Sequence, residues 1–341
     1  MYKIVLDVMG GDNSPIEQVK GAVMAVNEEK NLHVVLAGDE ERIKEVLKTE
    51  KYDPEQISFL DAKDVITNDD VPTVAIKQKN ESSLVKALNE TRLNDEIAGM
   101  VSTGSTGAVL TGGFLKIGRL KGVSRPALCP ILPTKLGGIV ALCDSGANMD
   151  CKPTNLIHFA VMASTYVEKV YGIKNPRVGL LSVGTEDHKG NDFTKQVFAM
   201  LKAQESINFV GNMEARDLLS GDYDVIVADG FNGNVLLKSA EGALLTMFDL
   251  LKQGIKSSFS SKIGYLFMKG TFKQLKSKLD YNKHGGAVLL GCKKIIVKGH
   301  GSSKATSVCE CLKQAVNMCK ADICDEIENR ISQVKVEENN D

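Results

Sequence analysis

Short apolar runs alternate with helix-length polar segments along almost the whole chain, and this alternation restricts the possible fold more than any other feature. The runs have the length and composition of β-strands, and they are YKIVLDV (2–8), LHVVLAG (32–38), ISFLDA (57–62), IAGMVS (97–102), RVGLLSVG (177–184), INFVGN (207–212), DVIVADG (224–230) and KIIVKG (294–299). Apolar strands that are separated by helices are typical of an α/β fold. We therefore predict an α/β protein with a largely parallel sheet.

One region breaks this alternation. Between residues 126 and 145 the sequence reads as two strands, ALCPIL and IVALCD, which are joined by the turn PTKLGG. Two strands joined by a Gly-containing loop indicate an antiparallel hairpin. We expect this hairpin to be inserted into the α/β framework.

The length of 341 residues suits two domains or one large two-lobed domain. We predict one two-lobed α/β domain over residues 1–333 and a disordered acidic tail over residues 334–341. No apolar run reaches the roughly 18 residues that a membrane-spanning helix needs, and the N-terminus lacks the pattern of a signal peptide. The expected location is therefore the cytoplasm. A formal net charge of −1 argues against a nucleic-acid-binding protein.

Eight cysteines are too few and too scattered in a chain of this length for a disulfide framework. A cluster near the C-terminus, Cys309, Cys311, Cys319 and Cys324, invites a metal-binding interpretation. However, the cluster lacks paired C-x-x-C spacing, and its cysteines recur with apolar residues at helical spacing. We therefore expect buried thiols on a helix and no metal site.

Polar, Gly-rich segments follow many of the predicted strands, just before the next helix. They are DVMGGDNSP (7–15), STGSTGA (102–108), DSGANMD (144–150), GTEDHKGND (184–192), DGFNGN (229–234) and GHGSSK (299–304). Ligands of open α/β sheets bind outside the carboxyl ends of the strands, so these loops can converge on one cleft. Backbone N–H groups in such loops favour an anion such as phosphate. Ordinary turn and capping chemistry explains any one loop, but six together favour a polar ligand site.

Several common catalytic signatures are absent. The sequence contains no G-x-G-x-x-G, no G-x-x-x-x-G-K-[ST] and no G-x-S-x-G. A simple Rossmann dehydrogenase, a P-loop enzyme and a serine hydrolase are therefore not indicated. None of the five histidines is followed five residues later by aspartate, so the H-x4-D pattern of glycerolipid acyltransferases is also missing.

Two residues in these loops are the best candidates for chemistry. Lys189 follows an apolar strand within a polar loop, where a lysine can hold a phosphate as a compact point charge or can simply be a solvated surface residue. Asn234 can donate its side-chain N–H to a developing oxyanion or can cap the helix that follows. His300 can contact an anion or anchor its loop, and we assign it no acid–base role.

A basic segment near residue 265 stands apart from the rest of the chain. From Leu250 to Leu279 there are seven lysines and no acidic residue, which leaves 35 basic against 43 acidic residues elsewhere. The apolar residues fall on two helical faces on either side of KGT (269–271), which predicts a hairpin of two short amphipathic helices over about 252–280. Its expected tip is at residues 266–268. Apolar residues flanked by lysines suit the surface of an anionic bilayer.

The order and spacing of these loops resemble the phosphate acyltransferase (PlsX) family of bacterial phospholipid synthesis. The resemblance covers nearly the whole chain and also includes CDSGANMDCKP, NFVGNMEARDLL and HGGAVLLG. It implies a reaction in which inorganic phosphate displaces acyl carrier protein from a long-chain acyl thioester and gives acyl phosphate, without a cofactor. The fold it implies is a three-layer α/β/α sandwich related to phosphate acetyltransferase and to the isocitrate and isopropylmalate dehydrogenases, assembled as a homodimer.

The resemblance also assigns residues. The essential lysine and asparagine of the family fall on Lys189 and Asn234. The expected phosphate- and substrate-binding residues are Asp7, Gly10, Gly11, Asp12, Gly104, Ser105, Thr106, Gly107, Asn148, Asp229, Gly230, Gly233, His300, Gly301 and Ser302. The amphipathic pattern of the hairpin, and not the resemblance, gives the expected membrane contacts, which are Lys262, Leu266, Phe267, Met268 and Lys269.

Family membership would place the protein peripherally on the inner face of the cell membrane, with the membrane acyl-phosphate:glycerol-3-phosphate acyltransferase as a candidate partner. Two other functions stay open: a phosphate acetyl- or butyryltransferase that uses coenzyme A, and a non-catalytic membrane scaffold. The hairpin has alternatives too, because a basic amphipathic pattern also suits a dimer interface or a docking patch for the acidic carrier protein.

Overall fold

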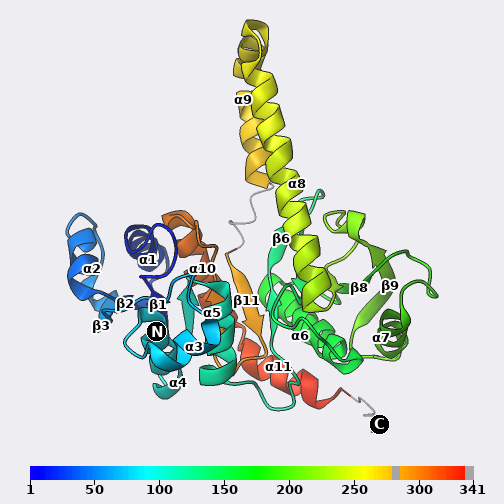
Figure 1. Ribbon diagram of the computed structural model, residues 1–341, viewed down its shortest axis with the longest axis horizontal. Coiled ribbons are helices and arrows are strands. Elements are labelled where there is room, and N and C mark those ends of the chain that lie inside the picture. The colour runs from blue at the N-terminus through cyan, green and yellow to red at the C-terminus, as the bar shows by residue number, and fades with distance from the viewer. Residues whose placement is uncertain (279–284, 335–341) are drawn as a thin grey trace.

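The computed structural model describes residues 1–278 and 285–334, which contain two β-sheets and a projecting pair of helices (Figure 1). The strands are β1 (Tyr2–Asp7), β2 (Leu32–Gly38), β3 (Ile57–Asp61), β4 (Ile97–Ser102), β5 (Ala127–Cys129), β6 (Ile131–Pro133), β7 (Ile139–Cys143), β8 (Arg177–Ser182), β9 (Asn208–Glu214), β10 (Val225–Val227), β11 (Ala287–Leu290) and β12 (Ile295–Lys298). The α-helices are α1 (Ile16–Glu28), α2 (Glu40–Leu47), α3 (Pro72–Gln78), α4 (Ser83–Leu93), α5 (Thr106–Gly112), α6 (Pro153–Tyr171), α7 (Asp192–Lys202), α8 (Gly230–Lys256), α9 (Phe259–Lys278), α10 (Ala305–Lys320) and α11 (Ile323–Ser332).

Each sheet forms the centre of what we call a lobe. The first lobe has the strand order β3-β2-β1-β4-β12-β11-β5, and the second has the order β6-β7-β10-β8-β9. The pairs among β1, β2, β3, β4 and β12 are parallel, as are those among β7, β8, β9 and β10. The prediction of a largely parallel α/β protein is therefore confirmed.

Alternating residues of the central strands face opposite helix layers. Ile4 and Leu6 of β1 belong to one buried cluster with residues of α1 and α10, whereas Val5 belongs to another with residues of α4. Successive side chains of a strand point to opposite faces of the sheet, so both faces of the sheet are covered by helices. This is the three-layer α/β/α arrangement that the resemblance implies.

The segment 126–145 contains the expected antiparallel hairpin, but its first strand is shorter than predicted. β6 pairs with β7 in the second sheet, whereas β5 pairs with β11 in the first sheet. Pro130 separates β5 from β6, and a proline has no N–H to give to a strand ladder. The run ALCPIL therefore carries the chain from one lobe to the other instead of forming one strand.

The projecting hairpin consists of α8 and α9 (Figure 1), and the sequence-based predictions of its start and its turn are wrong. Its helices are not short and do not begin near residue 252, because α8 begins at Gly230 and has 27 residues, and α9 has 20. The turn lies at Ser257 and Ser258, not at residues 266–268, because α9 continues unbroken through Lys269, Gly270 and Thr271. The Ser258 hydroxyl accepts a hydrogen bond from the Ser261 N–H at 3.0 Å, which is the usual way for a serine to begin a helix. This cap outweighs the two glycines within α9, Gly264 and Gly270.

Two predicted segments lie wholly or partly outside the described residues. These are the last two residues of the hairpin, 279–280, and the acidic tail beyond Val334. Within the described ranges, no helix has both the length and the apolar character needed to span a membrane.

Candidate functional site

The Gly-rich loops gather at the carboxyl edges of the two sheets. β1, β4 and β12 are parallel neighbours, so the loops that follow them lie together in the first lobe. β7, β10 and β8 are likewise parallel neighbours in the second lobe, which brings the loops 144–150 and 183–191 and the start of α8 to one edge. The convergence expected from the sequence is therefore present within each lobe.

A cavity of about 410 Å³ lies among the loops of the first lobe, and we call it the loop cavity. Six of the predicted binding residues line it: Gly11, Asp12, Gly104, Ser105, Thr106 and Gly301. Ser14, Thr67 and Asn68 add further polar groups. The cavity is large enough for a phosphate ion and is lined mainly by polar side chains and glycine backbone.

Close backbone approaches hold these loops in place. A Cβ atom on Gly10 would lie 2.7 Å from the backbone nitrogen of Gly104, so only glycine fits at this contact. The Thr103 hydroxyl donates to the carbonyl oxygen of Gly10 at 2.6 Å, and the Gln18 amide donates to the same oxygen at 2.9 Å. The Asp12 N–H donates to the Gly301 carbonyl at 2.8 Å and joins the loops after β1 and β12.

Asp7 is buried beneath these loops, at the end of β1, and does not line the loop cavity. Its buried carboxylate accepts hydrogen bonds from the hydroxyls of Ser83 at 2.6 Å and Ser102 at 2.7 Å. Burial raises the pKa of Asp7 above its ordinary value, although the two serine hydrogen bonds act in the opposite direction. Gly107 also lines neither the loop cavity nor the second cavity described below. It lies against Pro72, where a Cβ would meet the proline ring at 2.8 Å.

This second cavity, of about 310 Å³, lies between the lobes, and we call it the interlobe cavity. Thr106 and His300 line it from the first lobe, and Gly146 and Asn234 line it from the second. Leu128, Ile131, Leu132 and Leu237 give it an apolar wall. An apolar wall next to a few polar groups suits an acyl chain with a reactive thioester at its end.

Asn234 is inside helix α8 and does not cap it. The cap is Asp229, whose carboxylate accepts from the Asn232 N–H at 2.8 Å. Among the hydrogen bonds of residues 1–278 and 285–334, none uses the Asn234 side chain. The helix-capping alternative for Asn234 is therefore excluded, and its amide is available to a ligand in the interlobe cavity.

Glycines place the start of α8 against the loop after β7. A Cβ on Gly230 would lie 2.5 Å from the carbonyl oxygen of Asn148, and one on Gly233 would overlap the carbonyl oxygen of Asp144. Asn148 is buried, and its side-chain amide already donates to Pro126 and Asp144. These predicted binding residues line neither cavity and shape the wall behind Asn234.

The Asp144 carboxylate organises this loop. It accepts backbone N–H groups from Leu128, Gly146, Ala147 and Asn148 at 2.7–3.2 Å. Burial raises the pKa of Asp144, while these hydrogen bonds favour its charged form. Gly146 has φ +135° and lies beside Asn234, where a Cβ would be 3.6 Å from the Asn234 Cγ.

Lys189 lies outside both cavities. It is exposed in the loop between β8 and α7, and its backbone N–H donates to the Glu186 carbonyl at 3.0 Å. Because β8 and β10 are parallel neighbours, this loop and the start of α8 share one edge of the sheet. The structure therefore places Lys189 in the loop after β8 and Asn234 in the first turns of α8, at one edge of the sheet, without joining them in one cavity.

His300 and Ser302 interact with each other beside the interlobe cavity. The Ser302 N–H donates to the His300 Nδ1 at 3.2 Å, and the Ser302 hydroxyl lies 2.8 Å from the same nitrogen. Desolvation, followed by the charge of Lys298, lowers the pKa of His300 from its ordinary value. His300 faces the interlobe cavity, whereas Ser302 does not line either cavity.

Sequence reasoning missed Lys298, which lines both cavities. It is the last residue of β12, and only 8% of it is exposed. Burial lowers the pKa of Lys298 from 10.5 to about 8. A signal was present in the sequence, because a lysine at the end of the apolar strand KIIVKG, just before a Gly-rich loop, lies where ligands bind.

The cysteines do not gather into a metal centre of several thiolates within the described residues. One group of ligand-type atoms, from Glu28, Cys309 and Glu310, lies within 4.8 Å of one another. Lys313 donates to both carboxylates at 3.0 Å, so an ammonium is already paired with the two acidic groups. Cys309 and Cys311 are buried on α10, as predicted, whereas Cys319 and Cys324 are only partly buried and Cys324 lies on α11.

Comparisons with known proteins show the family to which the chain belongs. The family model described as "Fatty acid synthesis protein" matches residues 2–326. A phosphate acyltransferase of Clostridium novyi is 47% identical over 331 residues, which covers 97% of this chain and 99% of the relative. A phosphate acyltransferase of Bacillus thuringiensis is 47% identical over 322 residues, which covers 94% of this chain and 96% of that relative.

The fold is also similar to that of a solved phosphotransacetylase from Streptococcus pyogenes. The two structures superpose with a TM-score of 0.59 at 16% identity, over 93% of this chain and 94% of the other. The expected relationship to the phosphate acetyltransferase fold is thereby confirmed. The chain belongs to the fatty acid synthesis protein family, in which the two relatives above are phosphate acyltransferases, and it is an acyltransferase.

Proposed function

We propose that this enzyme transfers the acyl group of a long-chain acyl-[acyl carrier protein] to inorganic phosphate and releases acyl phosphate and free acyl carrier protein. The observation that carries the proposal is that two cavities of different character lie next to each other. The loop cavity is polar, the interlobe cavity has an apolar wall, and both are lined by Thr106 and Lys298. A small anion and an acyl thioester can therefore be bound next to each other.

In the proposed reaction an oxygen of phosphate attacks the carbonyl carbon of the thioester. A C–O bond forms, the C–S bond breaks, and the electron pair leaves with the sulfur of the carrier protein as a thiolate. Phosphate is already a nucleophile at neutral pH, so no side chain has to be acylated. The protein mainly has to hold the two reactants together and stabilise the tetrahedral oxyanion.

Asn234 and Lys189 have the two specific roles in this proposal. The free amide of Asn234 donates to the thioester carbonyl and to the oxyanion that develops from it. A single donor of this kind is worth about 3–4 kcal/mol in the transition state. Lys189 draws phosphate toward the thioester from the adjacent strand end. This role requires the exposed loop between β8 and α7 to approach the interlobe cavity when the substrates bind.

The proposed acyl donor is a carrier-protein thioester, and the alternative is coenzyme A. The two donors are distinguished by measuring acyl phosphate formation from long-chain acyl carrier protein, acetyl-CoA and butyryl-CoA at equal concentrations. We expect the carrier-protein thioester to give the highest kcat/KM. A preference for acetyl-CoA or butyryl-CoA would instead favour a phosphate acetyl- or butyryltransferase. A non-catalytic scaffold would use none of the three.

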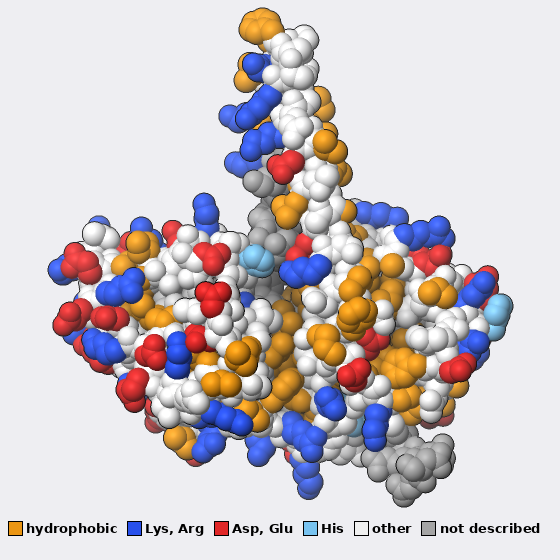
Figure 2. Space-filling model, viewed as in Figure 1, with side chains coloured by type: hydrophobic (Ala, Val, Ile, Leu, Met, Phe, Trp, Pro, Cys, Tyr) orange, Lys and Arg blue, Asp and Glu red, His pale blue; other side chains and the backbone are white. Residues whose placement is uncertain are grey.

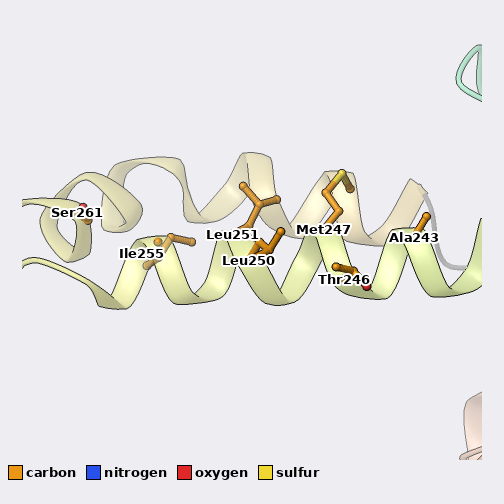
Figure 3. Close-up of a pocket in the computed structure, with 8 residues that line it drawn as sticks. Ala243, Thr246, Met247, Leu250, Leu251, Ile255 and Ser261 are labelled. Carbon is orange, nitrogen blue, oxygen red and sulfur yellow. The ribbon is translucent and has the colours of Figure 1, made fainter.

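A homodimer is supported by the apolar side of the projecting hairpin. Figure 3 shows Met247, Leu250, Leu251 and Ile255 beside the crevice between α8 and α9, whose volume is about 770 Å³. Exposed apolar surface of this extent is unfavourable in water and is typical of an interface. We propose that the hairpin of a second copy covers it. Light scattering should give twice the chain mass of 36.9 kDa.

Peripheral binding to an anionic membrane is supported by the outer part of the same hairpin. Basic and apolar side chains line the projection (Figure 2). Phe259 beside the turn is 79% exposed, and Leu266 and Phe267 are 69% and 87% exposed. At 1.5 Å per residue, Leu266 lies roughly 10 Å along α9 from Phe259. We therefore propose that the contact includes Phe259 at the turn as well as Lys262, Leu266, Phe267, Met268 and Lys269.

Membrane binding would also suit the chemistry of the product. An acyl phosphate is labile and lipid-like, so its release at a membrane surface limits its loss to water. The proposed consumer is the membrane acyl-phosphate:glycerol-3-phosphate acyltransferase. On this proposal the enzyme works in the cytoplasm, on the inner face of the cell membrane.

A further inference from the structure

Lys298 is the one lysine that is buried within the described part of the chain. It ends β12, between the parallel neighbour β4 and the antiparallel neighbour β11, and only 8% of it is exposed. With Thr106 it lines both the loop cavity and the interlobe cavity. A side chain in this place can contact a ligand that spans the junction of the two cavities.

The ammonium of Lys298 has no paired carboxylate among the described residues. It donates a hydrogen bond to the carbonyl oxygen of Gly299, and none of the ion pairs within residues 1–278 and 285–334 includes it. Lys313 provides a contrast, because it is paired with Glu28 and Glu310. A buried charge without a counter-charge is costly, so the site favours an anion that can pair with it.

Two aspartates close to Lys298 do not supply that pairing. Asp7 already accepts two serine hydrogen bonds, and burial raises its pKa. Asp12 is exposed and lines the loop cavity. The Asp12 carboxylate repels a fully ionised anion, but it can accept a hydrogen bond from a P–OH group. Inorganic phosphate at neutral pH still carries at least one such proton, so it can bind both Lys298 and Asp12.

We propose that Lys298 binds the phosphate substrate at the junction of the two cavities and directs one of its oxygens toward the interlobe cavity. This inference rests on the proposed function, and it adds a substrate-binding residue from the first lobe to Asn234 and Lys189 from the second. Phosphate held there borders the cavity that contains the Asn234 amide. The Lys298 ammonium gains its missing counter-charge only when phosphate is bound.

The main test replaces Lys298 by methionine, which keeps the length of the side chain but removes its charge. Lys294→Met is the matched control, because Lys294 lies next to the start of the same strand and lines neither cavity. Isothermal titration calorimetry with inorganic phosphate should show at least tenfold weaker binding for Lys298→Met and unchanged binding for Lys294→Met. The KM for phosphate should rise at least tenfold, with little change in the KM for acyl carrier protein thioester.

A second measurement needs no variant and therefore does not depend on how Lys298→Met folds. The wild-type protein is labelled with a lysine-acylating reagent at pH 8, with and without saturating phosphate, and each lysine is quantified by mass spectrometry. We expect phosphate to protect Lys298 several-fold and to leave Lys294 unprotected. Equal labelling of Lys298 in both samples would overturn the inference.

The outcomes separate this inference from the proposed function. Phosphate-dependent turnover in which Lys298→Met has the wild-type KM and affinity for phosphate would overturn the inference and leave the function intact. Phosphate binding that depends on Lys298, in a protein that does not turn over acyl carrier protein thioesters, would support the inference and contradict the function. Failure of the wild-type protein to bind phosphate would overturn the inference directly.

Discussion

Gly233 packs directly against the carbonyl oxygen of Asp144, and no side chain fits between them. This contact fixes the start of α8 against the loop after β7. Asn234 is the next residue along the chain, so the same contact sets the position of the amide that faces the interlobe cavity. Gly146, with φ +135°, leaves the space beside that amide open.

Gly233→Ala should destabilise the protein by about 3 kcal/mol, because the new methyl group overlaps backbone that cannot easily move. Activity should fall as well, since Asn234 is displaced. Gly242→Ala on the same helix is the matched control: its methyl group would project into open space, and alanine is the better helix former. Thermal unfolding of both variants provides the measurement, and equal stability would argue against the contact.

Asn234→Asp tests the proposed oxyanion donor. The substitution keeps the shape of the side chain but removes its N–H groups and adds a negative charge. We expect kcat to fall by about 10²–10³, with a much smaller change in the affinity for phosphate. Ser239→Ala, at an exposed position of the same helix, should retain normal kinetics. A variant Asn234→Asp with wild-type kcat would show that the amide does not stabilise the oxyanion.

Lys189→Ala tests whether this exposed lysine positions phosphate, as the resemblance implies. Acyl phosphate formation should fall at least a hundredfold, whereas the free energy of unfolding should change by no more than about 0.5 kcal/mol, because the side chain is exposed. Lys195→Ala, which removes another lysine from the nearby helix α7, serves as the control. Near-normal activity of Lys189→Ala would mean that Lys189 is only a solvated surface residue.

The projecting hairpin should bind lipid vesicles that contain anionic phospholipid. The double variant Leu266→Glu, Phe267→Glu and the single variant Phe259→Glu should both bind such vesicles more weakly than the wild-type protein. Added salt should also weaken wild-type binding, because lysines provide part of the attraction. Leu93→Glu introduces a charge at another exposed leucine, 70% exposed, and should bind normally. Unchanged binding of the α9 variants would leave the dimer interface or carrier-protein docking as the role of this surface.

The buried ammonium of Lys298 predicts a pH dependence of stability. The pKa of Lys298 in the folded protein, about 8, is below the ordinary value of 10.5, so the folded state binds fewer protons between these values. Stability should therefore rise with pH through this window, and below about pH 8 the buried charge costs up to about 3 kcal/mol. Asp7, Asp12, Lys238, His300 and Cys311 also act on this group.

Lys298→Met removes that cost. In phosphate-free buffer at pH 7 it should unfold at a higher temperature than the wild-type protein, and the difference should shrink as the pH approaches 10. Phosphate should raise the unfolding temperature of the wild-type protein but not that of the variant. A difference between the two proteins that does not vary with pH would contradict this explanation.

The fold could be predicted from the sequence where local patterns and packing agree. Short buried apolar runs such as IVL (4–6) in β1 favour strands between two helix layers, and the loops that follow parallel strands lie at one edge of the sheet. The division of ALCPIL between two sheets could not be predicted, because it depends on which partner strands lie on either side of Pro130. The helical hairpin was predicted, but its turn depends on the Ser258 cap, which outweighs the glycine at 270.

The site was predicted less completely than the fold. Glycines marked the loops, but the sequence cannot distinguish a glycine that lines a cavity, such as Gly104, from one that lets two backbones touch, such as Gly233. Asn148 looked like a binding residue because nothing in the sequence shows that Pro126 and Asp144 occupy its amide. Lys298 was missed because its burial and its lack of a carboxylate partner arise only from the packing of β12.

The central claim is that phosphate itself attacks a carrier-protein thioester. The most direct test is to incubate the protein with a long-chain acyl carrier protein, with and without inorganic phosphate, and to measure the free carrier-protein thiol while hydroxylamine traps acyl phosphate. We predict that thiol release requires phosphate and that one hydroxamate forms for each thiol released. Thiol release without phosphate, or no release by folded protein, would contradict the account.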